Sequence, residues 1–110
     1  PPEADAAQLG NTVLQRVREL ATTQGLRVTS SQTAAPREDK DQPGFGRIGV
    51  SLRVEGDWPQ LQGLLRALPA ERPAIYSDTM QLLSQGTQAG RASAMIQAQL
   101  ELFVLQERQP

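Results

Sequence analysis

The sequence predicts an α+β domain in which two helices cover one face of a four-stranded antiparallel sheet. Two stretches repeat apolar residues at the 3.6-residue period of an amphipathic helix, and four stretches alternate apolar and polar residues at the two-residue period of a strand. These stretches follow one another as helix, strand, strand, and this order occurs twice. The chain of 110 residues has the length of one domain with one core.

The first helix is predicted to begin near Asp5 and to end at Gly25. Asp5 and Gln8 have the spacing of a capping box, and a glycine followed by Leu26 is typical of a left-handed helix stop. We expect residues 1–4 to be disordered or part of a linker. The apolar positions of this helix share one face: Leu9, Val13, Val17, Leu20 and Ala21.

Two predicted strands follow the first helix. Residues 26–33 alternate as a half-buried strand, and residues 46–55 give the clearest strand of the sequence, with one fully apolar face. The intervening segment 34–46 is charged, contains Pro and Gly and has no periodicity, so we expect a long mobile hairpin loop. The inward residues of the clearest strand are Ile48, Val50, Leu52 and Val54.

The second half repeats this order. Asp57 as N-cap, with Gln60 three residues later, predicts the start of the second helix. Residues 74–84 predict a strand with Tyr76, Met80 and Leu82 on one side. Asp78 interrupts that side, either as a buried carboxylate or, as we favour, at a bulge or edge that lets it reach solvent. Residues 93–106 predict a long final strand. The apolar face of the second helix consists of Trp58, Leu61, Leu64, Leu65 and Leu68.

The topology follows from the handedness of crossover connections. Right-handed crossovers put the strands at 46–55 and 93–106 in the centre of the sheet and those at 26–33 and 74–84 at its edges. The edge candidates are the more polar and interrupted pair, as edge strands usually are. The predicted architecture is a two-layer sandwich with a ferredoxin-like fold in circularly permuted order, αββαββ.

Composition excludes several classes of function. The chain has no Cys and no His, which excludes disulfides, thiol nucleophiles, Ser/His/Asp triads and histidine-ligated metals. The formal charge is −1, so nucleic acid is not expected as a partner. Glu38, Asp39 and Asp41 lack the spacing of a calcium loop and are expected in a solvated loop. No apolar run is long enough to span a bilayer, and we expect no catalytic residues, metal or cofactor.

The candidate binding residues lie on the sheet. Phe103 and Leu105 are predicted to face away from the helices, towards solvent or a partner; the alternative is that they pack under the first helix or a loop. The edge strands 26–33 and 74–84 offer unpaired backbone groups to a second chain. The candidate interface therefore consists of Phe103, Leu105, Arg27, Thr29, Ser77 and Thr79.

Five segments carry a resemblance to a known family: Leu14–Ala21, Gly25–Val28, Ile48–Asp57, Leu61–Leu68 and Arg72–Asp78. Together they cover nearly the whole chain, and the chain resembles the periplasmic domain of type II secretion system protein M, subtype b. Alignment proteins of type IV pili share the same scaffold pattern. The segment 34–46 is longer and more charged than is usual for the family.

The resemblance implies a function. Members of this family are single-pass inner-membrane proteins with a periplasmic coiled coil and this terminal domain, and they form homodimers, pair with the system's protein L and support pseudopilus assembly. We therefore expect a non-enzymatic scaffold domain, with other platform or pseudopilus components as further partners and with an anchor in a segment preceding Pro1. The alternatives left open are a small-molecule-sensing regulatory domain and the equivalent protein of a type IV pilus; an acylphosphatase-like enzyme lacks its phosphate loop.

Overall fold

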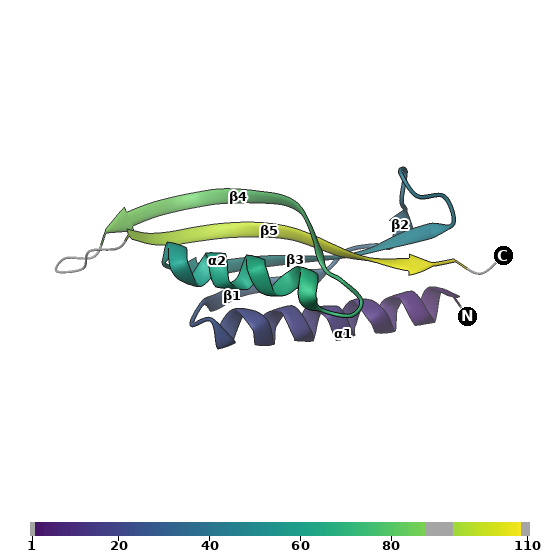
Figure 1. Ribbon diagram of the computed structural model, residues 1–110, viewed down its shortest axis with the longest axis horizontal. Helices are drawn as coiled ribbons and strands as arrows, with labels where there is room; N and C mark the ends of the chain where they lie inside the picture. Colours follow the sequence, from purple (N-terminus) through teal and green to yellow (C-terminus); the bar gives the residue numbers. More distant parts are fainter. Residues whose placement is uncertain (1, 88–93, 109–110) are drawn as a thin grey trace.

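The protein is an elongated two-layer structure of 58 × 23 × 22 Å (Figure 1). The computed structural model describes residues 2–87 and 94–108. Its elements are α1 (Pro2–Thr23), β1 (Arg27–Thr33), β2 (Arg37–Glu38), β3 (Phe45–Gly56), α2 (Trp58–Ala67), a short 3₁₀ helix η1 (Leu68–Ala70), β4 (Tyr76–Thr87) and β5 (Ala94–Glu107).

The sheet is antiparallel, and its strand order is β1-β3-β5-β4. This confirms the predicted topology, with the two most apolar strands in the centre and the two more polar strands at the edges. The short strand β2 is an addition to the prediction, and it pairs with β3 beyond the end of β1.

Both helices lie on one face of the sheet, and no helix of the described residues covers the opposite face (Figure 1). Helix α1 packs on β1 and β3, and α2 packs on β5. The core between the layers has the predicted inward faces of β3 and β5, including Leu52 and Leu100, each 0% exposed. Trp58 differs from its prediction, because it lies at the first position of α2 with 44% of its surface exposed.

The helix ends show which capping predictions hold. Gly25 has φ +88°, and the N–H groups of Gly25 and Leu26 donate to the carbonyls of Thr22 and Ala21, as in a Schellman stop. Asp57 and Gln60 form the predicted capping box at α2. The predicted start of α1 near Asp5 is wrong, because this helix begins at Pro2.

The early start of α1 has a physical explanation. Proline fits the first turn of a helix, where its missing N–H has no intrahelical acceptor. Ala6 is buried, so the first turns already pack against the rest of the domain. Residues 2–4 are therefore helical rather than linker, and Asp5 lies inside the helix instead of capping it.

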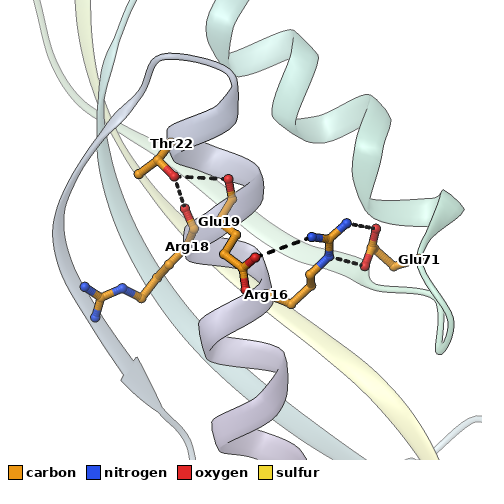
Figure 2. Close-up of polar contacts among 5 residues, drawn as sticks. All are labelled: Arg16, Arg18, Glu19, Thr22 and Glu71. Atoms are coloured by element: carbon orange, nitrogen blue, oxygen red, sulfur yellow. Dashed lines mark hydrogen bonds and ion pairs between the residues drawn. The ribbon is translucent and has the colours of Figure 1, made fainter.

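An ion pair ties α1 to the segment that leaves α2 (Figure 2). The Arg16 guanidinium donates from Nε and Nη2 to the two carboxylate oxygens of Glu71, at 2.7 and 3.1 Å. This hydrogen-bonded contact lowers the pKa of Glu71 and raises that of Arg16. The pair therefore connects two segments that are 55 positions apart in the sequence.

The segment 34–46 has more structure than the sequence predicts. Arg37 and Glu38 form β2, and the Ala34 N–H donates to the carbonyl of Gly49, so the chain continues along β3 after β1 ends. Asp39 is only 7% exposed, which corrects the expectation that it belongs to a solvated loop. The mobility of this segment stays a prediction.

Candidate interaction surfaces

The edge strand β4 carries an exposed apolar stripe, which we define as Met80, Leu82 and Leu83. These side chains are 41%, 50% and 38% exposed. Isolated exposed apolar residues are common on protein surfaces, but a contiguous group on a sheet edge is typical of an interaction site. The stripe was not among the predicted interface residues.

A β-bulge explains why the sequence pattern of β4 was misleading. Tyr76 pairs with Phe103, which lies on the face away from the helices, whereas Met80 pairs with the core residue Leu100. The register shifts between Ser77 and Thr79, so one extra residue exchanges the two faces. The prediction that Tyr76, Met80 and Leu82 share one side is therefore wrong.

The position of α2 explains why the stripe is exposed. Met80 and Leu82 pair with Leu100 and Ala98, so they lie on the helix-bearing face of the sheet. Helix α2 packs on β5, however, and β4 continues the sheet beyond it (Figure 1). Apolar side chains that would be covered by a wider helical layer are thus left at the edge.

The predicted residues Ser77 and Thr79 are both exposed and lie on either side of the bulge. Asp78 between them is 41% exposed at its side chain, which confirms the interpretation as a solvent-reaching bulge residue rather than a buried carboxylate. This part of β4 therefore combines backbone irregularity with polar side chains, next to the apolar stripe.

Phe103 and Leu105 lie on the open face, by which we mean the face of the sheet away from the helices. Phe103 is partly buried: its ring stacks on Tyr76 with centroids 5.4 Å apart, and the Arg47 guanidinium lies 3.9 Å from its centroid. Leu105 is also partly buried and pairs with Arg47 in the β3–β5 ladder. Neither residue packs under a helix; Phe103 contacts Tyr76 and Arg47, and Leu105 is the neighbour of Arg47 across the ladder.

Arg27 and Thr29 lie apart from the other predicted interface residues. They belong to β1, which β3 and β5 separate from β4. Arg27 forms an ion pair with Glu55 at 3.2 Å, and the Thr29 hydroxyl donates to the Arg53 carbonyl at 3.3 Å. The six predicted residues therefore fall on two opposite edges and one face rather than on a single site.

The open face also contains a hollow of about 390 Å³. Its residues come from β2, β3, β4, β5 and the link between β1 and β2: Ala34, Ala35, Arg37, Arg47, Gly49, Val50, Asp78, Thr79, Glu101, Leu102 and Phe103. Except for Thr79 and Phe103, these residues were not among the predicted interface residues, because they come together only in the sheet.

A partly buried ion pair between Arg47 and Asp39 supports the hollow. Arg47 Nε donates to Asp39 Oδ2 at 2.7 Å, and Asp39 Oδ1 accepts from the backbone N–H groups of Asp41 and Gln42, each at 2.9 Å. The contact with Arg47, followed by the two backbone donors, lowers the pKa of Asp39, and Asp39 raises the pKa of Arg47. The Arg47 side chain is thereby held in place at the wall of the hollow.

The described residues contain neither a metal-binding cluster nor a membrane-spanning helix. In residues 2–87 and 94–108, no group of three or more acidic side chains is placed to hold a metal ion. Within the same ranges, no helix has the length and apolarity that a membrane crossing needs.

The sequence and the fold of the chain are both similar to those of known proteins. The family model described as "Type II secretion system (T2SS), protein M subtype b" matches residues 1–106. The chain belongs to this family. The match covers both helices and nearly all of the sheet. Membership of this family makes the chain a component of the secretion machinery with a structural role in the assembly platform.

Solved structures agree with the fold of this protein M chain. The type 4 fimbrial biogenesis protein PilO from Pseudomonas aeruginosa has a TM-score of 0.69 at 9% identity, with 96% of this chain and 79% of PilO covered. A core-domain structure from Akkermansia muciniphila gives 0.66 at 9% identity, with 86% of this chain and 58% of that chain covered.

Another Akkermansia muciniphila structure, solved without the transmembrane region, has a TM-score of 0.62 at 12% identity; 86% of this chain and 53% of that chain are covered. The protein M chain thus spans little more than half of each of these two Akkermansia chains. No curated protein matches the sequence. At these identities the structural likeness shows the ferredoxin-like fold, and the family match alone shows the family.

Proposed function

We propose that this chain is the periplasmic, non-enzymatic scaffold domain of an inner-membrane protein M, which forms homodimers and pairs with protein L to support pseudopilus assembly and protein export. The family match supports the secretion system. The exposed apolar stripe on β4 is the observation that carries the interaction role, because it places apolar side chains next to unpaired backbone groups.

The proposed homodimer joins two β4 strands in antiparallel register centred on Gln81. In this register Met80 of one copy lies opposite Leu82 of the other, so residues of the helix-bearing face meet each other. Asp78 is the only charged residue of β4, three positions from the centre. The two Asp78 residues would therefore lie roughly 20 Å apart along the pair, with no like charges opposed.

The same edge is proposed to accept protein L. An edge strand can pair with only one further strand at a time, so the homodimer and the complex with protein L would compete. A micromolar dissociation constant corresponds to about 8 kcal/mol, which one added strand with two apolar contacts can supply.

The test introduces one lysine at each edge. Leu82→Lys places a charge at the β4 edge, and the matched control Gln32→Lys places one on β1, where Gln32 is exposed. Sedimentation velocity should show self-association that Leu82→Lys weakens at least tenfold and that the control leaves within twofold. Capture by the periplasmic domain of protein L should follow the same pattern.

Circular dichroism of the same samples establishes that both variants are folded. If the wild type neither self-associates nor binds protein L, the scaffold proposal is wrong. If Gln32→Lys is as damaging as Leu82→Lys, the interaction uses another surface.

A further inference from the structure

The hollow on the open face reaches the β4 edge only at Asp78 and Thr79, and its other lining residues belong to other parts of the sheet. Gly49, Ala34 and Ala35 have little or no side chain, and their small size gives the hollow its depth. A Cβ atom at Gly49 would lie 3.4 Å from the Ala34 Cβ and 3.5 Å from the Leu102 carbonyl oxygen, so the sheet itself has no steric need for a glycine here. The hollow is therefore a feature of the protein surface, and it is not the by-product of a backbone position that only glycine can occupy.

Two guanidinium groups converge at the rim of this hollow. Arg37 Nη2 and Arg47 Nη1 each lie 3.6 Å from the same oxygen, Oδ2 of Asp78. That distance is longer than the ~3.2 Å limit of an N–H···O hydrogen bond, so both contacts are ionic only. The terminal N–H groups facing this point can donate to a closer acceptor.

Arg47 is pre-organised for such an acceptor. Its Nε is fixed by the hydrogen bond to Asp39, its guanidinium lies on the Phe103 ring, and its side chain is 20% exposed. An arginine held from two sides loses little conformational freedom when it binds a ligand. A planar guanidinium is also the group best shaped to hold a carboxylate through two parallel hydrogen bonds.

Two further lining residues, Glu101 and Thr79, carry oxygen atoms that can accept hydrogen bonds from the N–H groups of a peptide backbone. Glu101 Oε1 accepts from Ser51 and from Gln99, at 3.0 and 2.8 Å, which fixes this carboxylate in orientation. The lining thus combines guanidinium donors with oxygen acceptors.

We propose that the hollow binds an extended acidic peptide segment of a partner protein, whose carboxylate side chain enters between Arg37 and Arg47. Asp78 occupies this position when the partner is absent. Because Asp78 is on a bulge at the sheet edge and its side chain is 41% exposed, it can turn towards solvent without breaking the β4–β5 ladder. The bound carboxylate then replaces that of Asp78, so both arginines keep an anionic partner.

A matched pair of peptides tests the proposal in nuclear magnetic resonance titrations of the ¹⁵N-labelled domain. The probes are a capped leucine-glutamate-leucine tripeptide and the same tripeptide with glutamine at its centre. The glutamate peptide should shift the amide signals of Gly49 and Phe103 and should bind at least fivefold more tightly. Equal binding of both peptides, or shifts confined to other parts of the domain, would overturn the proposal.

Three variants assign the binding to the arginine pair. Arg37→Gln should weaken binding of the glutamate peptide at least fivefold, and Asp78→Asn should tighten it at least twofold by removing the internal competitor. Arg66→Gln is the control, because Arg66 is exposed on α2 and does not line the hollow. Unchanged binding by Arg37→Gln, or weaker binding by Asp78→Asn, contradicts the proposal.

Acetate distinguishes a peptide site from a simple anion site. If acetate at equal concentration binds as tightly as the glutamate peptide, the hollow holds only an anion, and the peptide proposal is wrong. Sedimentation velocity of Arg37→Gln separates this site from the homodimer, which this variant should leave unchanged, so the two proposals fail independently.

Discussion

The two edges of the sheet differ in how completely the chain itself uses them. β1 has seven residues, and its single apolar residue, Val28, packs against the core. Helix α1 packs on β1 and donates from Arg18 to the hydroxyl of Ser31 at 3.1 Å. β4 has twelve residues, and its apolar stripe of Met80, Leu82 and Leu83 is exposed.

The difference between the two edges indicates where a partner can bind. Natural proteins protect sheet edges with short strands, bulges, charges or a covering element, because an open edge pairs readily with another chain. β1 has a short length, a bulge next to Thr29 and the charge of Arg27. β4 has two bulges and the charge of Asp78, but between the bulges it is regular and uncharged, and it exposes Met80 and Leu82.

The largest expected effect is a difference in the free energy of unfolding between two variants. One removes a side chain that packs between the helices and the sheet, and the other removes a side chain from the part of the same sheet face that no helix covers. Leu64 is 0% exposed and Leu82 is 50% exposed. Leu64→Ala should lower the free energy of unfolding by about 2–5 kcal/mol through the cavity it leaves, whereas Leu82→Ala should cost less than about 0.5 kcal/mol. Urea denaturation of dilute protein measures both values. A cost above 2 kcal/mol for Leu82→Ala would mean that β4 is used by the fold rather than left for a partner.

The sequence predicts those features of the fold that depend on local chemistry or on regular alternation. The stop at Gly25 and the cap at Asp57 depend on a few neighbouring residues, and the apolar faces of β3 and β5 depend on an unbroken period of two. Right-handed crossovers then give the strand order. These predictions hold because caps and strand faces are set by residues that are close in the sequence, and contacts with distant residues rarely alter them.

The candidate surfaces are less predictable because they depend on tertiary placement. The two-residue strand β2 has no period, and the burial of Asp39 depends on an arginine eight positions away across a hairpin. One bulge residue reversed the face of Tyr76. The exposure of Met80 and Leu82 depends on how far α2 extends over the sheet, which the pattern of β4 does not encode.

A smaller effect separates the β4 edge from the open face beside it. Phe103→Ser removes the ring that stacks on Tyr76 and supports Arg47, and it should lower the free energy of unfolding by about 1–2 kcal/mol. Sedimentation velocity should find self-association within twofold of the wild type, while the glutamate peptide binds more weakly. A variant that stays folded but no longer self-associates would move the homodimer interface from the edge to the open face.

The smallest expected effect is a loss of stability in acid. It concerns the segment that follows β1, where Asp39 stabilises the hairpin between β2 and β3. Arg47 keeps the pKa of Asp39 below its ordinary value of 3.8, so the ionised carboxylate stabilises the fold at neutral pH. This contribution is lost as the pH falls through the lowered pKa.

Asp39→Asn should therefore be less stable than the wild type at pH 7, and the difference should shrink in acid below the pKa of the folded state. Urea denaturation at a series of pH values measures the difference. A difference that grows as the pH falls would show that the Asp39 carboxylate does not stabilise the hairpin.

The central claim is that β4, and not β1, accepts a second copy of the chain. The sequence has no Cys, so Gln81→Cys introduces a unique thiol at the proposed symmetry axis, and Gln32→Cys introduces one on β1 as the control. Facing Cα atoms in an antiparallel pair lie about 4.5–5.5 Å apart, within the range that a disulfide spans. After mild oxidation, non-reducing electrophoresis should show a covalent dimer for most of the Gln81→Cys protein and little for Gln32→Cys. A Gln81→Cys protein that remains monomeric, or a control that cross-links equally well, would contradict the claim.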